Sequence, residues 1–270
     1  TLGNRTVAIG TGALSVQNFT TATDSFNTAV GHFAGGAVTT GLSNTFIGGL
    51  AGDSITDADN NTAVGTAALI TDTLGSHSTA VGESALRRQA FTSATNSYNT
   101  AVGSQAGSFV TTAIHNTLIG GLAGDALTDG SNNVILGKGS LSADTRGCRS
   151  VAIGNLALAV QNSTSLANMY NVAVGDAAGG AVTTGVQNTF VGSLAGDSST
   201  TANTNTLVGY QAGHNLTTGG ANTLIGSNNL ASAVDVATEI VIGRNGSGSG
   251  AATVTLCNGD TDAVLALDGS

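Results

Sequence analysis

A glycine-rich acidic motif is the first feature of this sequence that could bind a ligand. The segment Gly48-Gly49-Leu50-Ala51-Gly52-Asp53 is similar to the nonapeptide calcium repeat, Gly-Gly-x-Gly-x-Asp, but its spacing differs by one residue. The longer stretch Asn44 to Asp53 that contains it recurs at Asn116 to Asp125 and at Asn188 to Asp197, which is too sparse to gather the six to eight oxygens that calcium needs. We therefore expect the aspartates to cap turns, and we predict no metal site and no cofactor.

The other reactive side chains do not form a catalytic pattern. No histidine pairs with a Cys, a second His or an acidic residue at ligand spacing, although a threefold assembly could bring three copies of one histidine together. No Gly-x-Ser-x-Gly lies on a strand–turn–helix, and no glycine-rich stretch carries a phosphate-binding lysine. These absences predict that the protein is not an enzyme. The four histidines are His32, His77, His115 and His214.

Aromatic and basic side chains gather in three spacers that are four residues longer than the rest, namely Ser15 to Phe26, Arg87 to Tyr98 and Ala159 to Tyr170. Loops on repeat scaffolds often carry recognition, and rings with a polar edge suit contact with a glycan or a protein. The alternative is that these side chains fill a wider coil. The candidate binding residues are Phe19, Phe26, Arg87, Arg88, Phe91, Tyr98, Met169 and Tyr170.

Threonine pairs raise a different possibility, because a flat threonine lattice on a solenoid can bind ice. The pairs Thr39-Thr40, Thr111-Thr112 and Thr183-Thr184 recur only once in every four repeats, whereas an ice-binding face needs threonines in register on every coil. Strand propensity and hydroxyl ladders offer a simpler explanation.

All these residues are positioned by a short repeat, whose mark is two apolar residues followed by a glycine. Successive glycines lie 17 residues apart or, once in every four repeats, 21 residues apart. A period this short is typical of stacked coils rather than of a globular core. The fourteen glycines, numbered here as position 0, are Gly10, Gly31, Gly48, Gly65, Gly82, Gly103, Gly120, Gly137, Gly154, Gly175, Gly192, Gly209, Gly226 and Gly243.

We predict an all-β fold, a parallel β-roll or β-solenoid of about 14–15 stacked coils over residues 1–258. Four coils make a 72-residue superrepeat, which gives the repeats 27–98, 99–170 and 171–242. The segment Thr253 to Asn258 matches the motif with Cys257 in place of the glycine. Residues 259–270 are interpreted as a terminal segment or the start of a further fibre element.

Three positions of the repeat carry the structural predictions. Positions −1 and −2 are apolar in every copy, so both faces of the strand should be buried, and a threefold bundle of chains would cover the second face. Asparagines at position −4 should form a hydrogen-bonded ladder. Each anchor glycine should supply a backbone angle or a close approach that other residues cannot. Examples are Asn27, Asn44, Asn61, Asn99 and Asn116 with Gly31, Gly48, Gly65, Gly103 and Gly120.

Composition and charge exclude several classes of partner. The 270 residues carry a net charge of −9 and only seven Lys plus Arg, too few for the basic surface that a nucleic-acid partner would need. No run of about 20 apolar residues is present, so this part of the protein should not insert into a membrane. The sequence starts without a signal peptide, and we expect any anchor or export signal to lie outside it.

The motifs Asn27-Thr28-Ala29-Val30-Gly31, Asn99-Thr100-Ala101-Val102-Gly103 and Ser150-Val151-Ala152-Ile153-Gly154 resemble the head repeats of trimeric autotransporter adhesins and the repeats of trimeric phage tail fibres. The resemblance covers nearly the whole chain. It implies a left-handed parallel β-roll, an obligate homotrimer of intertwined chains, and attachment to a cell surface through a glycan or protein receptor.

Autotransporter heads have shorter coils, so the 17- and 21-residue spacings favour the phage-type fibre. The expected function is therefore a tail-fibre-like shaft or tip, extracellular on a virion or a bacterial surface. A bacterial adhesin head is the first alternative, and an ice-binding or matrix solenoid is the second.

Overall fold

The computed structural model describes residues 3–259 and 262–266 of the chain. The chain divides into two compact units, Thr1–Asn132 and Asn133–Ser270. Both are parallel β-solenoids with a period of about 17 residues, and the chain makes about 15 turns. The described residues contain strands, turns and bends but no helix. The all-β solenoid predicted from the repeat is confirmed.

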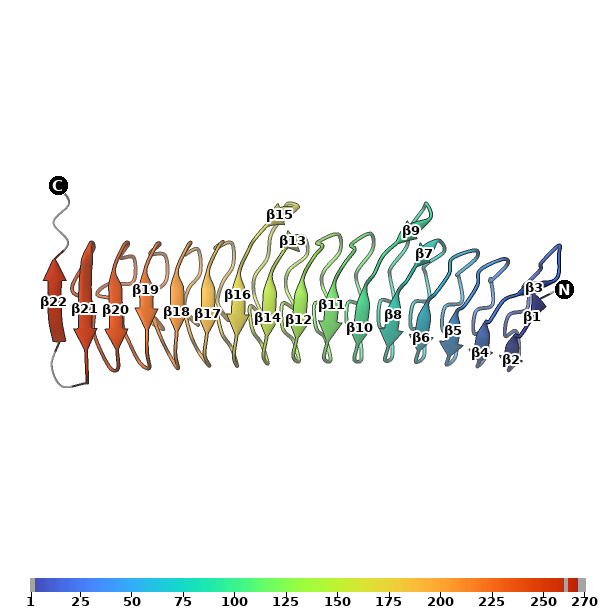
Figure 1. Ribbon diagram of the computed structural model, residues 1–270, viewed down its shortest axis with the longest axis horizontal. Coiled ribbons are helices and arrows are strands. Elements are labelled where there is room, and N and C mark those ends of the chain that lie inside the picture. The colour runs from blue at the N-terminus through green and yellow to red at the C-terminus, as the bar shows by residue number, and fades with distance from the viewer. Residues whose placement is uncertain (1–2, 260–261, 267–270) are drawn as a thin grey trace. The chain divides into compact units, whose positions relative to one another are not determined.

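The first unit is a ladder of three-residue parallel strands, one per coil (Figure 1). Neighbouring strands pair at equal repeat positions, as Thr28 with Thr45 and Ala29 with Phe46. Register therefore follows the sequence period. The ladder contains β2 (Val7–Ile9), β4 (Thr28–Val30), β5 (Thr45–Ile47), β6 (Thr62–Val64), β8 (Thr79–Val81), β10 (Thr100–Val102) and β11 (Thr117–Ile119).

The second unit repeats this arrangement and ends differently. Strand β20 pairs in parallel with β21, where Gly243 lies opposite Cys257, and β21 then pairs with β22 in an antiparallel manner. Residues 260–261 and 267–270 of the predicted terminal segment lie outside the described residues. The strands are β12 (Val134–Leu136), β14 (Val151–Ile153), β16 (Val172–Val174), β17 (Thr189–Val191), β18 (Thr206–Val208), β19 (Thr223–Ile225), β20 (Ile240–Gly243), β21 (Thr253–Cys257) and β22 (Asp262–Ala266).

The three longer coils add a pair of two-residue strands each, which stand beside the main ladders in Figure 1. In each pair, the extra residues of the long coil lie parallel to the preceding coil, for example Gly75 opposite Thr95. The pairs are β1 (Gly3–Asn4) with β3 (Thr23–Asp24), β7 (Gly75–Ser76) with β9 (Thr95–Asn96), and β13 (Gly147–Cys148) with β15 (Ala167–Asn168).

The core of each coil is narrow, and in coils such as those of Phe46 and Ala63 its volume is shared between two positions. From Ala29 to Val241, position −2 points inward and is fully buried, as the prediction required, whereas Ala8 in the first coil is exposed. Where it holds Phe46, position +4 of the same coil is Gly52, and a side chain there would collide with the Phe46 ring. Where it holds Ala63, position +4 is the buried Leu69. This exchange of large and small side chains keeps the interior close-packed.

The anchor glycines meet both predicted requirements. Gly65 has a φ of +129°. A Cβ on this residue would also lie 2.5 Å from the carbonyl oxygen of Gly82 in the next coil. Only glycine fits the combination of this angle and this approach. The same geometry holds at Gly31, Gly48 and Gly103, and Gly120 shares the positive φ, at +130°.

The predicted asparagine ladder is present, although backbone groups are its main partners. The side-chain oxygen of Asn27 accepts a hydrogen bond from the backbone N–H of Asn44 at 2.8 Å. The side-chain nitrogen of Asn44 donates to the carbonyl oxygen of Ala58 at 2.8 Å. Asn44 in turn accepts from the backbone N–H of Asn61 at 2.9 Å. Each buried amide thus fastens its own coil and the next one.

At the long coils, a buried glutamine makes hydrogen bonds where the asparagine ladder is interrupted. Ser78 replaces the asparagine before the second long coil, and its hydroxyl shares a hydrogen bond of 2.6 Å with that of Ser97 in the long coil. The Nε2 of Gln89 donates to Ser78 Oγ at 2.7 Å and to Asp72 Oδ2 at 2.5 Å. The Oε1 of Gln89 accepts from Asn99 Nδ2 at 2.9 Å. Gln161 makes the equivalent bonds to Ser150, Asp144 and Asn171, and Gln17 donates to Thr6.

Candidate functional surfaces

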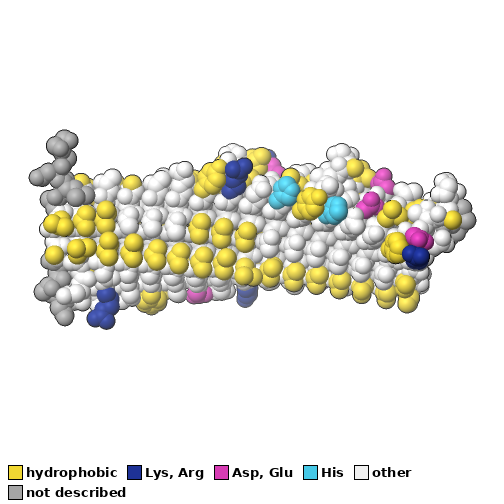
Figure 2. All heavy atoms as spheres, viewed as in Figure 1, with side chains coloured by type: hydrophobic (Ala, Val, Ile, Leu, Met, Phe, Trp, Pro, Cys, Tyr) yellow, Lys and Arg dark blue, Asp and Glu magenta, His cyan; other side chains and the backbone are white. Residues whose placement is uncertain are grey.

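The outer face of the main ladder carries an apolar column at position −1. Its side chains are half-buried or exposed within a single chain; Ile47, for example, is 41% exposed. Of the two strand faces predicted to be buried, the chain therefore covers the −2 face by itself and leaves the −1 face open. The column is seen as a row of hydrophobic side chains along each unit in Figure 2. In the first unit it contains Ile9, Val30, Ile47, Val64, Val81, Val102 and Ile119.

A threonine column runs beside the apolar one, and the sequence analysis missed it. Position −3 lies on the same strand face as position −1, because side chains two residues apart share a face. Six successive strands of the first unit place a half-exposed threonine there, in register with its neighbours. The threonine pairs singled out from the sequence lie outside these strands. The column contains Thr28, Thr45, Thr62, Thr79, Thr100 and Thr117.

The candidate residues of the long coils divide into two groups. Phe19, Phe91 and Met169 are buried, which agrees with the interpretation that they fill a wider coil. The side chains of Phe26, Arg87, Arg88, Tyr98 and Tyr170 are exposed and available for contact.

The exposed rings of the long coils share one arrangement at position −5. In every long coil the ring lies against a basic or imidazole side chain of the coil before it. The Arg5 guanidinium lies 5.3 Å from the centre of the Phe26 ring, and the Arg149 guanidinium lies 5.8 Å from that of Tyr170. Arg149 Nη1 also donates to the Tyr170 hydroxyl at 3.1 Å.

The second long coil extends this arrangement into a stack of three rings. Tyr98 lies between His77 and His115, at centroid distances of 5.0 and 5.7 Å and in near-parallel planes. Tyr98 is 52% exposed. The stack therefore presents a ring with polar edges to solvent, which is a surface suited to a sugar or a peptide.

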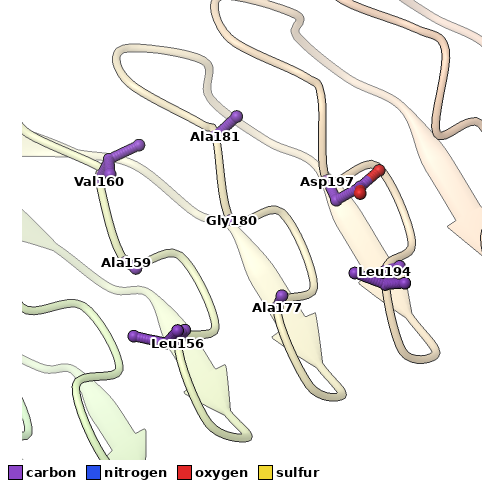
Figure 3. A pocket seen from close by; sticks show the side chains of 8 residues that line it. All are labelled: Leu156, Ala159, Val160, Ala177, Gly180, Ala181, Leu194 and Asp197. Atoms are coloured by element: carbon purple, nitrogen blue, oxygen red, sulfur yellow. The ribbon is translucent and has the colours of Figure 1, made fainter.

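A groove crosses three coils of the second unit, from the last coil of the superrepeat 99–170 to the first two coils of the superrepeat 171–242 (Figure 3). Its volume is about 430 Å³. Aliphatic side chains and backbone form most of its wall, and the single charged side chain is Asp197. The lining residues are Leu156, Ala159, Val160, Ala177, Gly180, Ala181, Leu194 and Asp197.

One carboxylate oxygen of Asp197 lacks a hydrogen-bond partner in this groove. This atom is Oδ1, and it is buried. Burial raises the pKa of Asp197, while the charge of His214 and the backbone N–H groups of Asp197 and Ser198 lower it. A buried carboxylate oxygen that lacks a donor is expected to attract one.

The equivalent groove of the first unit has a volume of about 450 Å³ and extends from the coil before the first superrepeat to the first two coils of that superrepeat. Asp53 takes the place of Asp197, and burial likewise raises its pKa. A Cβ on Gly36 would lie 2.6 Å from Asp53 Oδ1, so the carboxylate lies directly over this glycine. The groove is lined by Ser15, Val16, Phe33, Gly36, Ala37, Asp53 and Ser54.

Where the superrepeat 27–98 passes into 99–170, the equivalent positions carry larger side chains. Arg88 takes the place of Val16 and Val160, and Phe109 takes the place of Ala37 and Ala181. The Arg88 guanidinium lies 4.2 Å from the centre of the Phe109 ring. A cation and a ring of the chain itself therefore occupy this position.

Of the calcium-like aspartates, Asp53 and Asp197 thus line grooves, and Asp125 holds the same repeat position where Arg88 and Phe109 take the place of the groove. Among residues 3–259 and 262–266, no group of three or more His, Cys, Asp or Glu side chains is placed to hold a metal ion. Within the same residues, no helix has the length and apolarity that crossing a membrane requires.

Comparison with known proteins identified no matching family model, no matching curated protein and no matching solved structure.

Proposed function

We propose that this chain is a structural and adhesive segment of a homotrimeric fibre, in which the exposed ladder faces of three copies pack together. The observation that carries the proposal is the unbroken aliphatic column at position −1. Seven such side chains follow one another in the first unit at the strand spacing of about 4.8 Å. Single apolar residues are common on protein surfaces, but a continuous apolar patch marks an interaction site.

The composition of this face supports association between copies. Positions −1 and −3 of the first unit hold only Val, Ile and Thr, although the chain carries a net charge of −9. Two or three copies can therefore approach one another here without like-charge repulsion. Depletion of charge is a feature of interface cores.

Adhesion is assigned to the exposed rings at the long coils. In a trimer each of these weak sites would occur three times on one particle, which raises the avidity for a repetitive surface glycan or protein. The proposal applies both to a phage tail fibre and to the head of a bacterial adhesin, and the domains that flank the segment would distinguish the two.

The test of association is the absolute molar mass in solution, measured by light scattering after size exclusion. We expect about three times the chain mass of 26.1 kDa, unchanged on dilution. Val64→Lys, in the middle of the column, should reduce the mass to that of one chain. Thr66→Lys, at an exposed site that follows the strand, is the matched control and should leave the mass unchanged. A wild-type monomer at every concentration would contradict the proposal.

Ice binding is a second candidate function, and the in-register threonine column favours it. Six threonines on neighbouring strands form the regular row that the threonine pairs do not provide. The two candidates compete for one face, because a trimer interface would cover the threonines.

The ice-binding candidate requires a monomer that inhibits ice recrystallisation. It also requires that Thr62→Tyr, which adds a bulky ring to the row, abolishes the inhibition. An unchanged recrystallisation rate with the wild-type protein would remove this candidate.

A further inference from the structure

We propose that the surface at the third long coil binds an acidic sugar, whose carboxylate is held by Arg149 beside the Tyr170 ring. The inference rests on the adhesive part of the proposed function and deepens it, because it names the class of ligand and the residues that recognise it. The site consists of Arg149, Asn168 and Tyr170, called the Arg149 site below. All three side chains are exposed, and all belong to the second unit.

The first long coil shows how a site of this kind is completed. The Arg5 guanidinium lies over the Phe26 ring, and Arg5 Nη1 also lies 3.3 Å from a carboxylate oxygen of Asp24. Asp24 ends β3, and its partner in β1 is Asn4, the neighbour of Arg5. A ring, a guanidinium and a carboxylate of the chain therefore stand together on the surface of this coil.

The third long coil has the same arrangement without the carboxylate. Arg149 and Tyr170 again form the guanidinium–ring pair, and β13 pairs with β15 as β1 does with β3. The residue in the place of Asp24 is Asn168, whose amide carries no charge. Among residues 3–259 and 262–266, the Arg149 side chain makes no ion pair and donates only to the Tyr170 hydroxyl, at 3.1 Å. A guanidinium has five N–H donors in a fork that fits a carboxylate, so most of them remain for a ligand.

The fold itself requires neither a cation nor a ring at these positions. Arg149 and Tyr170 have φ angles of +62° and +52°, in the left-handed region that side chains with a Cβ rarely adopt. The same repeat position of a regular coil in this unit is Ala221, with a φ of +58°. Because alanine meets the same backbone requirement, the charge and the ring of the third long coil are available for recognition.

The acidity of the whole chain does not prevent an anion from binding here. The net charge is −9, but charges further apart than about 10 Å are largely screened at about 0.1 M salt. Asp144, the acidic residue nearest to Arg149 in the sequence, is buried. Its two oxygens already accept hydrogen bonds from the Gly147 N–H and Gln161 Nε2, at 2.9 and 2.6 Å. The exposed charge of the Arg149 site is therefore positive.

The side chains around Arg149 favour a sugar over an acidic peptide. Asn168 offers an amide, and Tyr170 offers a hydroxyl and an apolar ring, which match the hydroxyls and the C–H groups of a pyranose. Peptides are usually held by an open sheet edge or by a groove that takes their side chains, whereas these three side chains stand exposed on the surface. An acidic sugar combines the carboxylate that Arg149 lacks with hydroxyls that its neighbours can bind.

Saturation-transfer NMR on the full chain tests the inference, and it serves equally for a monomer and a trimer. The probe is methyl β-D-glucuronide, and the matched control is methyl β-D-glucoside, in which a hydroxymethyl group replaces the carboxylate. We expect a saturable signal from the glucuronide, with binding about tenfold tighter than that of the glucoside. Acetyl-glutamate amide, which carries its carboxylate on an amino acid, should bind no better than the glucoside.

Substitutions in the two long coils locate the site. Arg149→Gln should abolish the signal, and Arg5→Gln is its matched control, because Arg5 already has a carboxylate partner. Asn168→Asp copies the first long coil and should block the sugar. Asp24→Asn makes the converse change, so adding it to Arg149→Gln should restore binding at Arg5. This gain of binding would also show that the variant is folded.

Four results would overturn the proposal: no saturable signal, equal binding of the two sugars, an unchanged signal with Arg149→Gln, or tighter binding of acetyl-glutamate amide than of the glucuronide. None of these results depends on the molar mass, so failure here is distinguishable from failure of the trimer proposal.

Discussion

In the first unit, the regular coils fill their interior with apolar side chains, whereas the coils at the long insertion fill it with polar ones. At interior position +7 the regular coils bury Val38 and Ile55, whereas the coils that meet at the long insertion bury Asp72 and Gln89. An apolar interior tolerates exchange of similar side chains. A buried polar interior is stable only if every group has its partner.

This difference in interior side chains explains why the long coils recur at fixed places. In the second and third long coils, a serine before the coil, a glutamine within it and an asparagine after it form one network. In the first long coil Gln17 donates to Thr6, but its Oε1 has no partner. Asp72 adds acceptors for the backbone N–H groups of Gly75 and Phe91, at 3.1 and 3.3 Å. The insertion is therefore specified by hydrogen bonds, and the rings at its tip are held on a defined scaffold.

The largest effect is expected from replacing an anchor glycine, which the regular coils and the long coils share. Gly65→Ala places a Cβ 2.5 Å from the Gly82 carbonyl oxygen at a φ of +129°, so we expect a loss of about 3 kcal/mol or more in the free energy of unfolding. Denaturant unfolding measures it. Gly49→Ala is the matched control, since no atom lies within 4 Å of its Cβ. Equal effects of the two substitutions would show that the close approach is not the cause.

A smaller loss of stability is expected from a substitution that affects the long coil and not the regular coils. Gln89→Ala removes the donor to Asp72 and Ser78 and the acceptor for Asn99, so we expect a loss of about 2 kcal/mol or more in the free energy of unfolding. Local hydrogen exchange should rise at β7 and β9 before it rises at β5 and β6. Gln187→Ala, at an exposed glutamine, should change stability by less than about 0.5 kcal/mol. Uniform exchange along the unit would contradict a local role for Gln89.

The smallest effect is expected at Asp125, the aspartate at repeat position +5 of its coil. Burial raises the pKa of Asp125 above the ordinary 3.8, so its ionisation opposes folding above the raised pKa, and this cost disappears as the pH falls below 3.8. Asp125→Asn should therefore raise the melting temperature slightly at pH 7 and leave it unchanged in acid. Calorimetry at both pH values checks this, with the exposed Asp235→Asn as control. A lower melting temperature for Asp125→Asn at pH 7 would contradict the sign.

The parts of the fold that the sequence predicts are those in which every coil repeats the same local requirement. The anchor glycines, the asparagines and the inward −2 residues each recur at one position, so their periodicity exposes their role. The network around Gln89 was missed because its members lie 17, 11 and 10 residues away and only stacking brings them together. The grooves were missed because they depend on small residues from three different coils.

The candidate site residues were only partly predictable for a related physical reason. Sequence identifies an aromatic residue in a long coil but not the side to which it points. Phe91 and Tyr98 lie in the same long coil, yet the first packs inward and the second stacks between two histidines in solvent. The threonine column was not predicted because only adjacent threonine pairs were considered, and not the single threonine at position −3 of the strands.

The most direct measurement of the central claim is the rate of thiol labelling at position −1 in the assembled protein. Val64→Cys places a thiol in the aliphatic column, Thr66→Cys places one at an exposed control site, and the native Cys148 and Cys257 are buried. The account predicts fast labelling at residue 66 and strong protection at residue 64, since a second copy covers the column. Equally fast labelling at both sites would contradict it, because the ladder face would then be open to solvent.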